Sequence, residues 1–207
     1  MIRTHSVTKS YGTTVVVDDV SLAIPRGGVT ALIGGNGAGK STLLAIMARL
    51  LRADGGTVSV DGIDVRSSDT RELARRLAIL RQDNHLAVRL TVWELVSFGR
   101  HPHSGGHLTA RDHRIISRAI ERLDLSEFAS RHLDELSGGQ RQRAFVAMVL
   151  AQETDYILLD EPLNNLDMRH AISMMRLLKE IAAKDGRTCV VVVHDVNIAA
   201  TFADHLV

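Results

Sequence analysis

Residues 34–41 read Gly34-Gly35-Asn36-Gly37-Ala38-Gly39-Lys40-Ser41, and they match the pattern G-x-x-x-x-G-K-[ST] in full. The apolar run 29–33 precedes them and suits a buried strand, whereas Leu43, Leu44 and Met47 follow at helical spacing. Glycines in such a loop free successive backbone N–H groups, and the positive end of the following helix also attracts negative charge. The stretch therefore predicts a phosphate-binding loop, or P-loop, in an α/β fold.

The side chains of this loop predict the kind of ligand. Lys40 can place its charge on the β- and γ-phosphates of a nucleoside triphosphate, and the Ser41 hydroxyl suits Mg²⁺. The alternative, a glycine-rich turn without a ligand, does not explain why strand, loop, lysine, serine and helix stand in register. The expected binding residues are Gly34, Gly35, Asn36, Gly37, Ala38, Gly39, Lys40, Ser41 and Thr42.

A second chemical pattern lies at the end of an apolar run. Residues 156–159 read as a strand, and two carboxylates, Asp160 and Glu161, follow it directly. We expect Asp160 to hold Mg²⁺, through water, and Glu161 to polarise an attacking water as general base. Paired carboxylates at a strand end are common on protein surfaces, but the P-loop upstream favours the functional interpretation.

Composition limits the class of protein. The chain has 207 residues, of which 45% are hydrophobic and 24% charged, as in a globular domain. The formal net charge of +1 disfavours nucleic acid as the main partner. Cys189 is the only cysteine, which excludes an internal disulfide and favours a reducing compartment. No stretch approaches the ~20 apolar residues of a membrane helix, so we expect any work at a membrane to be done from its surface.

Strands alternating with helices predict an α/β core. The apolar runs 156–159 and 189–193 fit parallel strands covered on both faces. Shorter runs at 15–17, 20–24 and 57–60 predict an antiparallel β portion near the N-terminus.

The middle of the chain has a helical period. Candidate helices cover 71–80, 92–98 and 115–125, after the helix expected over 40–51. We expect one domain over 1–207, with a helical subdomain at about 83–136 inserted into the core.

The run 136–143 reads Leu136-Ser137-Gly138-Gly139-Gln140-Arg141-Gln142-Arg143. Ser137 can cap a following helix, and the two glycines expose backbone N–H groups at its positive end. This run resembles the ABC signature, and together with the other motifs it makes essentially the whole chain similar to the ATPases of ABC transporters. The resemblance implies ATP as the ligand. It also implies that Ser137, Gly138, Gly139 and Gln140 bind the γ-phosphate of ATP held by an opposite subunit, in a head-to-tail homodimer or a close pseudo-dimer.

Further family elements stand in the expected order. Tyr11 resembles the aromatic residue that stacks on adenine, and Gln82 resembles the glutamine that senses Mg²⁺ and the γ-phosphate. Residues 165–167, which end in Asp167, resemble the loop along the dimer seam, and His194 resembles the histidine that contacts the γ-phosphate. The resemblance therefore implies catalytic roles for Gln82, Glu161 and His194 and nucleotide contacts for Tyr11 and Asp167.

Two departures from the family pattern stand out. Glycine occupies position 35, where proline is common in the family, and we expect phosphate binding to survive because no N–H donor is lost. The sequence ends at Val207, whereas family members usually continue with further β structure and a closing helix, so we expect a C-terminally truncated chain.

The sequences of two segments indicate a subgroup within this family. Residues 98–103 and 161–168 resemble the ATPases of bacterial ferric-siderophore importers, near those for petrobactin and related catecholates. The resemblance implies an integral membrane permease, an extracytoplasmic substrate-binding protein and a peripheral position on the cytoplasmic face of the membrane. Importers of haem or cobalamin, a soluble non-transport ABC ATPase, an exporter ATPase and an inactive nucleotide-binding scaffold remain alternatives.

The segment 92–103 carries two more expectations. By residues alone Gly99-Arg100-His101-Pro102 is a helix stop. We expect the segment to help dock a permease helix, with Arg100 on the docking surface and Gln82 between ATP and the permease. A metal site at His101, His103 and His107 is conceivable, although no acidic or cysteine partner accompanies them.

Overall fold

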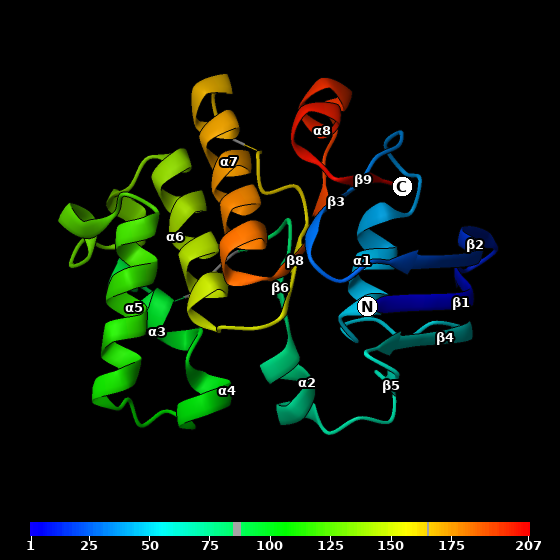
Figure 1. Cartoon of the computed structure of the whole chain (residues 1–207), viewed down its shortest axis with the longest axis horizontal. Helices are drawn as coiled ribbons and strands as arrows, with labels where there is room; N and C mark the ends of the chain where they lie inside the picture. Colours follow the sequence, from blue (N-terminus) through cyan, green and yellow to red (C-terminus); the bar gives the residue numbers. More distant parts are fainter. Residues whose placement is uncertain (85–87, 165) are drawn as a thin grey trace.

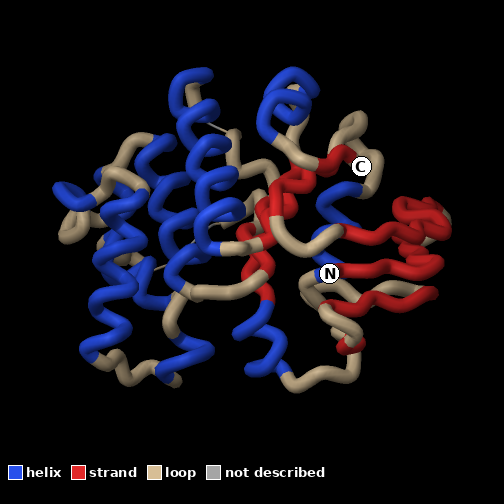
Figure 2. The backbone as a smooth tube through the Cα atoms, viewed as in Figure 1, coloured by secondary structure: helices blue, strands red, loops and turns tan. Residues whose placement is uncertain are grey.

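The computed structural model describes residues 1–84, 88–164 and 166–207, and its elements form two sheets with helices around them (Figures 1 and 2). The strands are β1 (Ile2–Tyr11), β2 (Thr14–Ile24), β3 (Gly28–Leu32), β4 (Gly55–Val60), β5 (Ile63–Asp64), β6 (Leu77–Leu80), β7 (Tyr156–Leu159), β8 (Thr188–Val192) and β9 (His205–Leu206). The α-helices are α1 (Lys40–Met47), α2 (Thr70–Arg76), α3 (Val92–Phe98), α4 (His101–Ser104), α5 (Ala110–Arg122), α6 (Gly138–Ala151), α7 (Met168–Asp185) and α8 (Val196–Phe202), with 3-10 turns η1 (Ser126–Phe128) and η2 (Leu133–Glu135).

The central sheet is parallel and has the strand order β6-β7-β8-β3-β9. Leu159 at the end of β7 pairs with Leu80 at the end of β6 and with Val191 in β8. At the other side of β8, Val192 pairs with Leu32 at the end of β3. Four strands therefore end within about one residue of each other, and the segments that follow them start at one edge of the sheet.

Both faces of this sheet are buried, as the continuous apolar runs predict. Ile157, Leu159 and Val191 pack on the side of the helices α3, α5, α6 and α7, whereas Leu158 and Val190 pack against α1 and the N-terminal strands. The alternation follows from the period of two along a strand. The result is a layered α/β core, which confirms the predicted fold class.

The first sheet is antiparallel, with the order β2-β1-β4-β5. It confirms the predicted N-terminal β portion. Helix α1 contacts β1, β2 and β4 and lies between the two sheets, so its buried side chains Leu44 and Met47 join them into one core. This position fixes the helix that begins at the P-loop.

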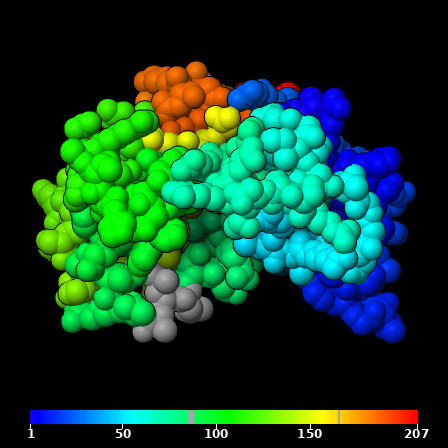
Figure 3. All heavy atoms as spheres, turned by 90° about the horizontal axis from the view of Figure 1, so that it is seen from below, coloured from blue at the N-terminus to red at the C-terminus, as the bar shows by residue number. Residues whose placement is uncertain are grey.

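The helices α3, α4 and α5 occupy the middle of the chain, on the left in Figure 1. Seen from below, the region of α2 lies between these helices and the N-terminal strands (Figure 3). The buried residues Leu95, Ile116 and Phe145 join α3, α5 and α6. Gly99 lies so close to α6 that an added Cβ atom would approach the Met148 carbonyl oxygen to 2.1 Å. None of the helices in the described ranges has the length and apolar content needed to cross a bilayer.

Three element predictions need correction. The helix expected over 71–80 ends at Arg76, and 77–80 form the edge strand β6. The runs 15–17 and 20–24 belong to one strand, β2, which contains Asp19 at φ 46°. Helix α1 ends at Met47 instead of Leu51, since Arg49 adopts φ 57° and breaks the helical path.

The prediction that Arg100 lies on a docking surface is wrong. Arg100 is 3% exposed, and its Nε donates to Asp112 Oδ1 at 2.8 Å. Its Nη1 donates to the Ala151 carbonyl oxygen at 2.7 Å and to Glu153 Oε2 at 3.2 Å. The helix stop itself is confirmed, because α3 ends at Phe98. Arg100 therefore holds α4, α5 and the end of α6 together.

The metal site considered at His101, His103 and His107 is not supported by the structure. Within the described ranges no group of three or more His, Cys, Asp or Glu side chains is placed to hold a metal ion. The Nε2 atom of His103 instead lies 2.8 Å from the Gln152 carbonyl oxygen.

We predict that Asp112→Asn lowers the free energy of unfolding by about 2 kcal/mol, because it leaves a buried guanidinium without its nearest charged acceptor. Urea unfolding at neutral pH measures the change. The exposed pair Glu72 and Arg76 supplies the control, since Glu72→Gln should cost less than about 0.5 kcal/mol.

The buried pair of Arg100 and Asp112 also predicts a pH dependence of stability. Hydrogen bonds from Thr109 and Arg100 lower the pKa of Asp112 below its ordinary value. The contribution of Asp112 to the free energy of unfolding is therefore complete above the pKa that this carboxyl has in the unfolded chain. It is lost as the pH falls through the lower pKa that the carboxyl has in the folded protein. The difference between wild type and Asp112→Asn should shrink in that acidic range, and a difference that grew there would contradict the assignment.

Candidate functional site

The predicted site residues follow the ends of the parallel strands. The P-loop follows β3, Gln82 follows β6, Asp160 and Glu161 follow β7, and His194 follows β8. Because these four strands end at one edge of the sheet, their following segments meet there. The structure thus brings together residues that are more than 100 positions apart in sequence.

Backbone geometry shapes the P-loop. Gly39, the N-cap of α1, has φ 82°, and a Cβ atom there would lie 2.3 Å from the Val16 carbonyl oxygen. Only glycine fits this close approach between the loop and β2. The Lys40 ammonium donates to the carbonyl oxygens of Gly34 and Gly35, both at 2.8 Å. The Lys40 ammonium therefore lies over the backbone of the loop. A bound phosphate could replace the two carbonyl oxygens as the hydrogen-bond partner of this ammonium.

A hydroxyl and a carboxylate form the candidate magnesium site. Ser41 Oγ donates to Asp160 Oδ1 at 2.8 Å, which ties the start of α1 to the end of β7. Burial raises the pKa of Asp160 above its ordinary value, the hydrogen bond from Ser41 opposes that shift, and the charge of Glu161 adds to it. These oxygens are of the hard type that Mg²⁺ prefers, and a cation would favour the ionised carboxylate. The residues present therefore fit the ion.

The Glu161 carboxylate is held from three sides. Its Oε1 lies 2.6 Å from His194 Nε2, and its Oε2 accepts from Gln82 Nε2 at 2.8 Å and from Asn164 Nδ2 at 2.6 Å. The Glu161 side chain is only 10% exposed, and its backbone adopts φ 51°, a left-handed conformation that is costly for a residue other than glycine. This geometry turns the carboxylate toward the P-loop.

A pocket of about 360 Å³ contains these groups. It is lined by Val16, Asn36, Gly37, Ala38, Gly39, Lys40, Ser41, Thr42, Gln82, Glu161 and His194. The predicted P-loop residues, the predicted base, the predicted glutamine and the predicted histidine thus share one cavity. Gly34 and Gly35 contribute through their carbonyl oxygens, and Asp160 through Ser41.

The signature residues form a different cluster. Ser137 is the N-cap of α6, where its Oγ accepts from Gln140 N at 3.3 Å and Gln140 Oε1 accepts from Ser137 N at 3.0 Å. Gly138 and Gly139 begin the helix. Asp167 is the N-cap of α7, and its Oδ1 accepts from His170 N. A pocket of about 250 Å³ lies between these two helix starts and shares no lining residue with the P-loop pocket.

One predicted residue stands apart from these clusters. Tyr11 is 53% exposed at the end of β1 and does not line the P-loop pocket. The Lys9 ammonium lies 5.9 Å from the centre of its ring. Asn165, the first residue of the expected seam loop, lies outside the described residues.

Sequence reasoning missed several contacts of the site. Asn164 donates to Glu161, three residues before it in the same turn, and Val16 lines the P-loop pocket. Arg143 and His170 line the signature pocket. Asn164 could have been found from its place in the turn after two carboxylates, whereas the contact with Val16 depends on how the two sheets pack.

We predict that Gly35→Pro raises the thermal midpoint slightly, through about 0.4–1 kcal/mol of lost freedom in the unfolded chain. Gly35 lies outside the left-handed region, and an added Cβ atom would meet nothing within 4 Å. Gly39→Ala is the matched contrast and should destabilise, because of the Val16 carbonyl oxygen. Calorimetry of both variants measures the effects, and a lower midpoint for Gly35→Pro would show that the loop needs a conformation closed to proline.

Comparison with known proteins agrees with this geometry. The family model described as ABC transporter matches residues 17–164. The chain is 49% identical to the petrobactin import ATP-binding protein YclP of Bacillus subtilis and 52% identical to its counterpart FatE of Bacillus anthracis, covering all of this chain and 82% of each relative. The dimeric structure of the ABC transporter cassette MJ0796 superposes with a TM-score of 0.89 at 31% identity, over 100% of this chain and 93% of that one.

A second structure of the same cassette, in a post-hydrolysis state bound to ADP and Pi, superposes equally well, with a TM-score of 0.89 at 30% identity and the same coverage of both chains. The resemblance to siderophore-importer ATPases is therefore confirmed at the level of family and fold. The shared strand ends, P-loop and signature have one explanation: this chain belongs to the ABC transporter family of ATP-binding proteins.

Proposed function

We propose that this chain is the ATP-hydrolysing subunit of an importer that carries a ferric siderophore across the cytoplasmic membrane. The observation that carries the ATPase half is the Glu161 carboxylate, oriented by His194 and Gln82 at the wall of the P-loop pocket. The cargo rests on relatives with about half of their residues identical over the full chain, which are named for petrobactin import.

The residues divide the work of ATP hydrolysis. The P-loop N–H groups and Lys40 bind the phosphates, and Ser41 and Asp160 hold Mg²⁺, which when bound neutralises charge on the phosphate oxygens. Glu161 accepts the proton of the attacking water. Its Oε2 already accepts from Gln82 and Asn164, whereas Oε1 contacts His194 alone, so Oε1 has a free acceptor site for that water. Gln82 and His194 therefore orient the carboxylate while it binds the water.

The separation of the two anion sites favours a pair of subunits. Within one chain the signature pocket and the P-loop pocket share no lining residue, which supports their assignment to different ATP molecules. A head-to-tail homodimer places Ser137, Gly138, Gly139 and Gln140 of one copy at the γ-phosphate held by the other, with Asp167 along the seam. The dimeric structure of the similar cassette supports this arrangement. Tyr11 is assigned to adenine from its resemblance to the aromatic residue that stacks on the base in this family, and its ring is exposed at the end of β1.

The remaining partners follow from the importer assignment. The chain works as a peripheral subunit on the cytoplasmic face, together with an integral permease and an extracytoplasmic binding protein for the siderophore. Its single ATP-binding domain includes a helical subdomain at about 83–136, and the segment near Gln82 and α3 meets the permease. Haem and cobalamin remain alternative cargoes, because cargo contacts belong to the other subunits.

We predict that Glu161→Gln lowers the ATP hydrolysis rate at least 100-fold and leaves ATP binding intact, because the amide cannot take the proton while the pocket keeps its shape. Steady-state phosphate release and equilibrium nucleotide binding measure the two effects. Glu121→Gln, on the exposed face of α5, is the control and should behave as wild type. Wild-type turnover by the Glu161→Gln protein would remove Glu161 as the base.

The cargo has a separate test. A strain without this gene should fail to accumulate labelled ferric petrobactin under iron limitation, and the intact gene should restore uptake whereas the Glu161→Gln gene should not. Uptake of labelled haem and cobalamin is measured in parallel. Normal siderophore uptake with a loss of either of these two would keep the ATPase assignment and overturn the cargo.

A further inference from the structure

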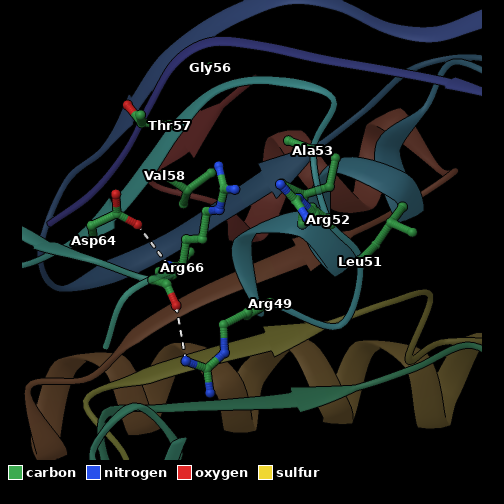
Figure 4. A pocket seen from close by; sticks show the side chains of 11 residues that line it. Arg49, Leu51, Arg52, Ala53, Gly56, Thr57, Val58, Asp64 and Arg66 are labelled. Atoms are coloured by element: carbon green, nitrogen blue, oxygen red, sulfur yellow. Dashed lines mark hydrogen bonds between the residues drawn. The ribbon is translucent and has the colours of Figure 1, made fainter. Parts of the chain in front are cut away.

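A third pocket, of about 320 Å³, lies between the end of α1, β4 and the segment that leads from β5 toward α2 (Figure 4). It shares no lining residue with the P-loop pocket or the signature pocket. No step of ATP hydrolysis or dimer formation described above uses it. Its volume is at the lower end of the range for small-molecule sites.

The floor of this pocket is hydrophobic. Ile46, Val58 and Val65 are 3%, 4% and 4% exposed, and they bring α1, β4 and the segment after β5 together. Leu51 and Ala53 line it as partly buried side chains. Such a surface favours the hydrocarbon part of a ligand, at about 25 cal/mol per Å² of apolar area removed from water.

Three arginines line the same pocket, and one of them is structural. The Arg49 guanidinium donates to the carbonyl oxygens of Val65 at 3.2 Å and Ser68 at 2.6 Å, and to Thr70 Oγ1 at 2.8 Å. These bonds hold the segment between β5 and α2 against the end of α1. The shape of the pocket is therefore fixed by the protein itself, which lowers the cost of binding a ligand.

The other two arginines have no such partners. Among the described residues, neither Arg52 nor Arg66 lies within 4.0 Å of a carboxylate, and neither guanidinium donates a hydrogen bond. In Figure 4 both side chains lie in the pocket, on the side of Val58 and Ala53. They place two positive charges beside an apolar floor, and neither forms an ion pair with a described residue.

The carboxylates nearby form hydrogen bonds with groups other than the two guanidiniums. Asp54 accepts from Lys9 Nζ at 2.6 Å and from Ser10 N at 2.8 Å. Asp64, which also lines the pocket, accepts from the backbone N–H of Arg66 at 2.7 Å. Neither carboxylate is ion-paired with Arg52 or Arg66, so both guanidiniums remain available to an anionic ligand.

We propose that this pocket binds a planar aromatic carboxylate of one or two rings. A carboxylate can accept paired N–H bonds from a guanidinium, and a flat ring can stack on a guanidinium plane while its edge lies on the apolar floor. Inorganic phosphate would satisfy the charge and leave the floor in contact with water. A neutral aromatic molecule would cover the floor and leave the charges unpaired. The combination selects an anion with an apolar body.

Binding of 2-naphthoate to the full chain tests the proposal, with calorimetry for affinity and methyl chemical shifts of Val58 and Val65 for location. We expect a saturable dissociation constant of about 0.1–1 mM, a value within reach of a ligand of this size. Inorganic phosphate and 2-naphthylmethanol, measured in the same way, should each bind at least tenfold more weakly.

The variants separate charge from shape. Arg52→Gln combined with Arg66→Gln should weaken 2-naphthoate binding at least tenfold, whereas Arg114→Gln, which removes an exposed arginine on α5, should not change it. Ala53→Trp fills the pocket without removing a charge and should also abolish binding. Thermal midpoints confirm that each variant is folded.

Several results would overturn the proposal. They are the absence of saturable binding, equal binding by the double variant, equal binding of phosphate, and shifts confined to the P-loop. Since the measurement needs neither ATP hydrolysis nor transport, failure here leaves the proposed function untouched, and a failed uptake experiment leaves this site untouched.

Discussion

The parallel pairing of β6, β7, β8 and β3 is the constraint on which the site depends. Parallel strands all present their carboxyl ends at one edge, and the registers of these four bring those ends level. A shift of one residue in β7 would turn every side chain of that strand to the other face and move the two carboxylates away from the P-loop. Leu158 now packs on the side of α1, and Leu159 packs on the side of α6 and α7. Such a shift would exchange the two sides and disrupt the packing of both layers.

One hydrogen bond closes this arrangement. Ser41 belongs to α1, which packs between the two sheets, and Asp160 belongs to the end of β7, so the 2.8 Å contact between them joins two layers at the site. The buried position of Asp160 raises its pKa and so disfavours the charged carboxylate. A cation held at the candidate magnesium site would offset that cost, because it favours the ionised form.

The sequence predicted most of this site because its chemistry is carried by short local patterns. A P-loop or a carboxylate pair after an apolar run needs only neighbours in sequence, and the layered fold follows from those runs. β6 was missed for a physical reason. Leu73, Leu77 and Leu80 have helical spacing, and a four-residue edge strand is too short to show a period of its own. Only its pairing with β7 makes it a strand.

Arg100 shows the opposite limit. An arginine at the end of a helix is usually exposed, and the neighbouring sequence does not indicate which residues it will contact. Asp112 lies twelve residues away, and the Ala151 carbonyl oxygen comes from α6, more than fifty residues later. Such distant partners decide whether a charged side chain can be buried, because removing an unpaired guanidinium from water costs more free energy than the fold could supply.

Glu161 illustrates how the site uses a conformation that the fold has to impose. A left-handed backbone at a glutamate costs of the order of 1 kcal/mol, and glycine would adopt it more readily. Glycine, however, carries no carboxylate, and an extended backbone at this position would continue β7 instead of turning its side chain into the pocket. His194, Gln82 and Asn164 each supply a contact that exists only in the turned conformation. The three polar contacts therefore stabilise the strained backbone of Glu161. That backbone in turn places the carboxylate where β6, β7, β8 and the P-loop meet.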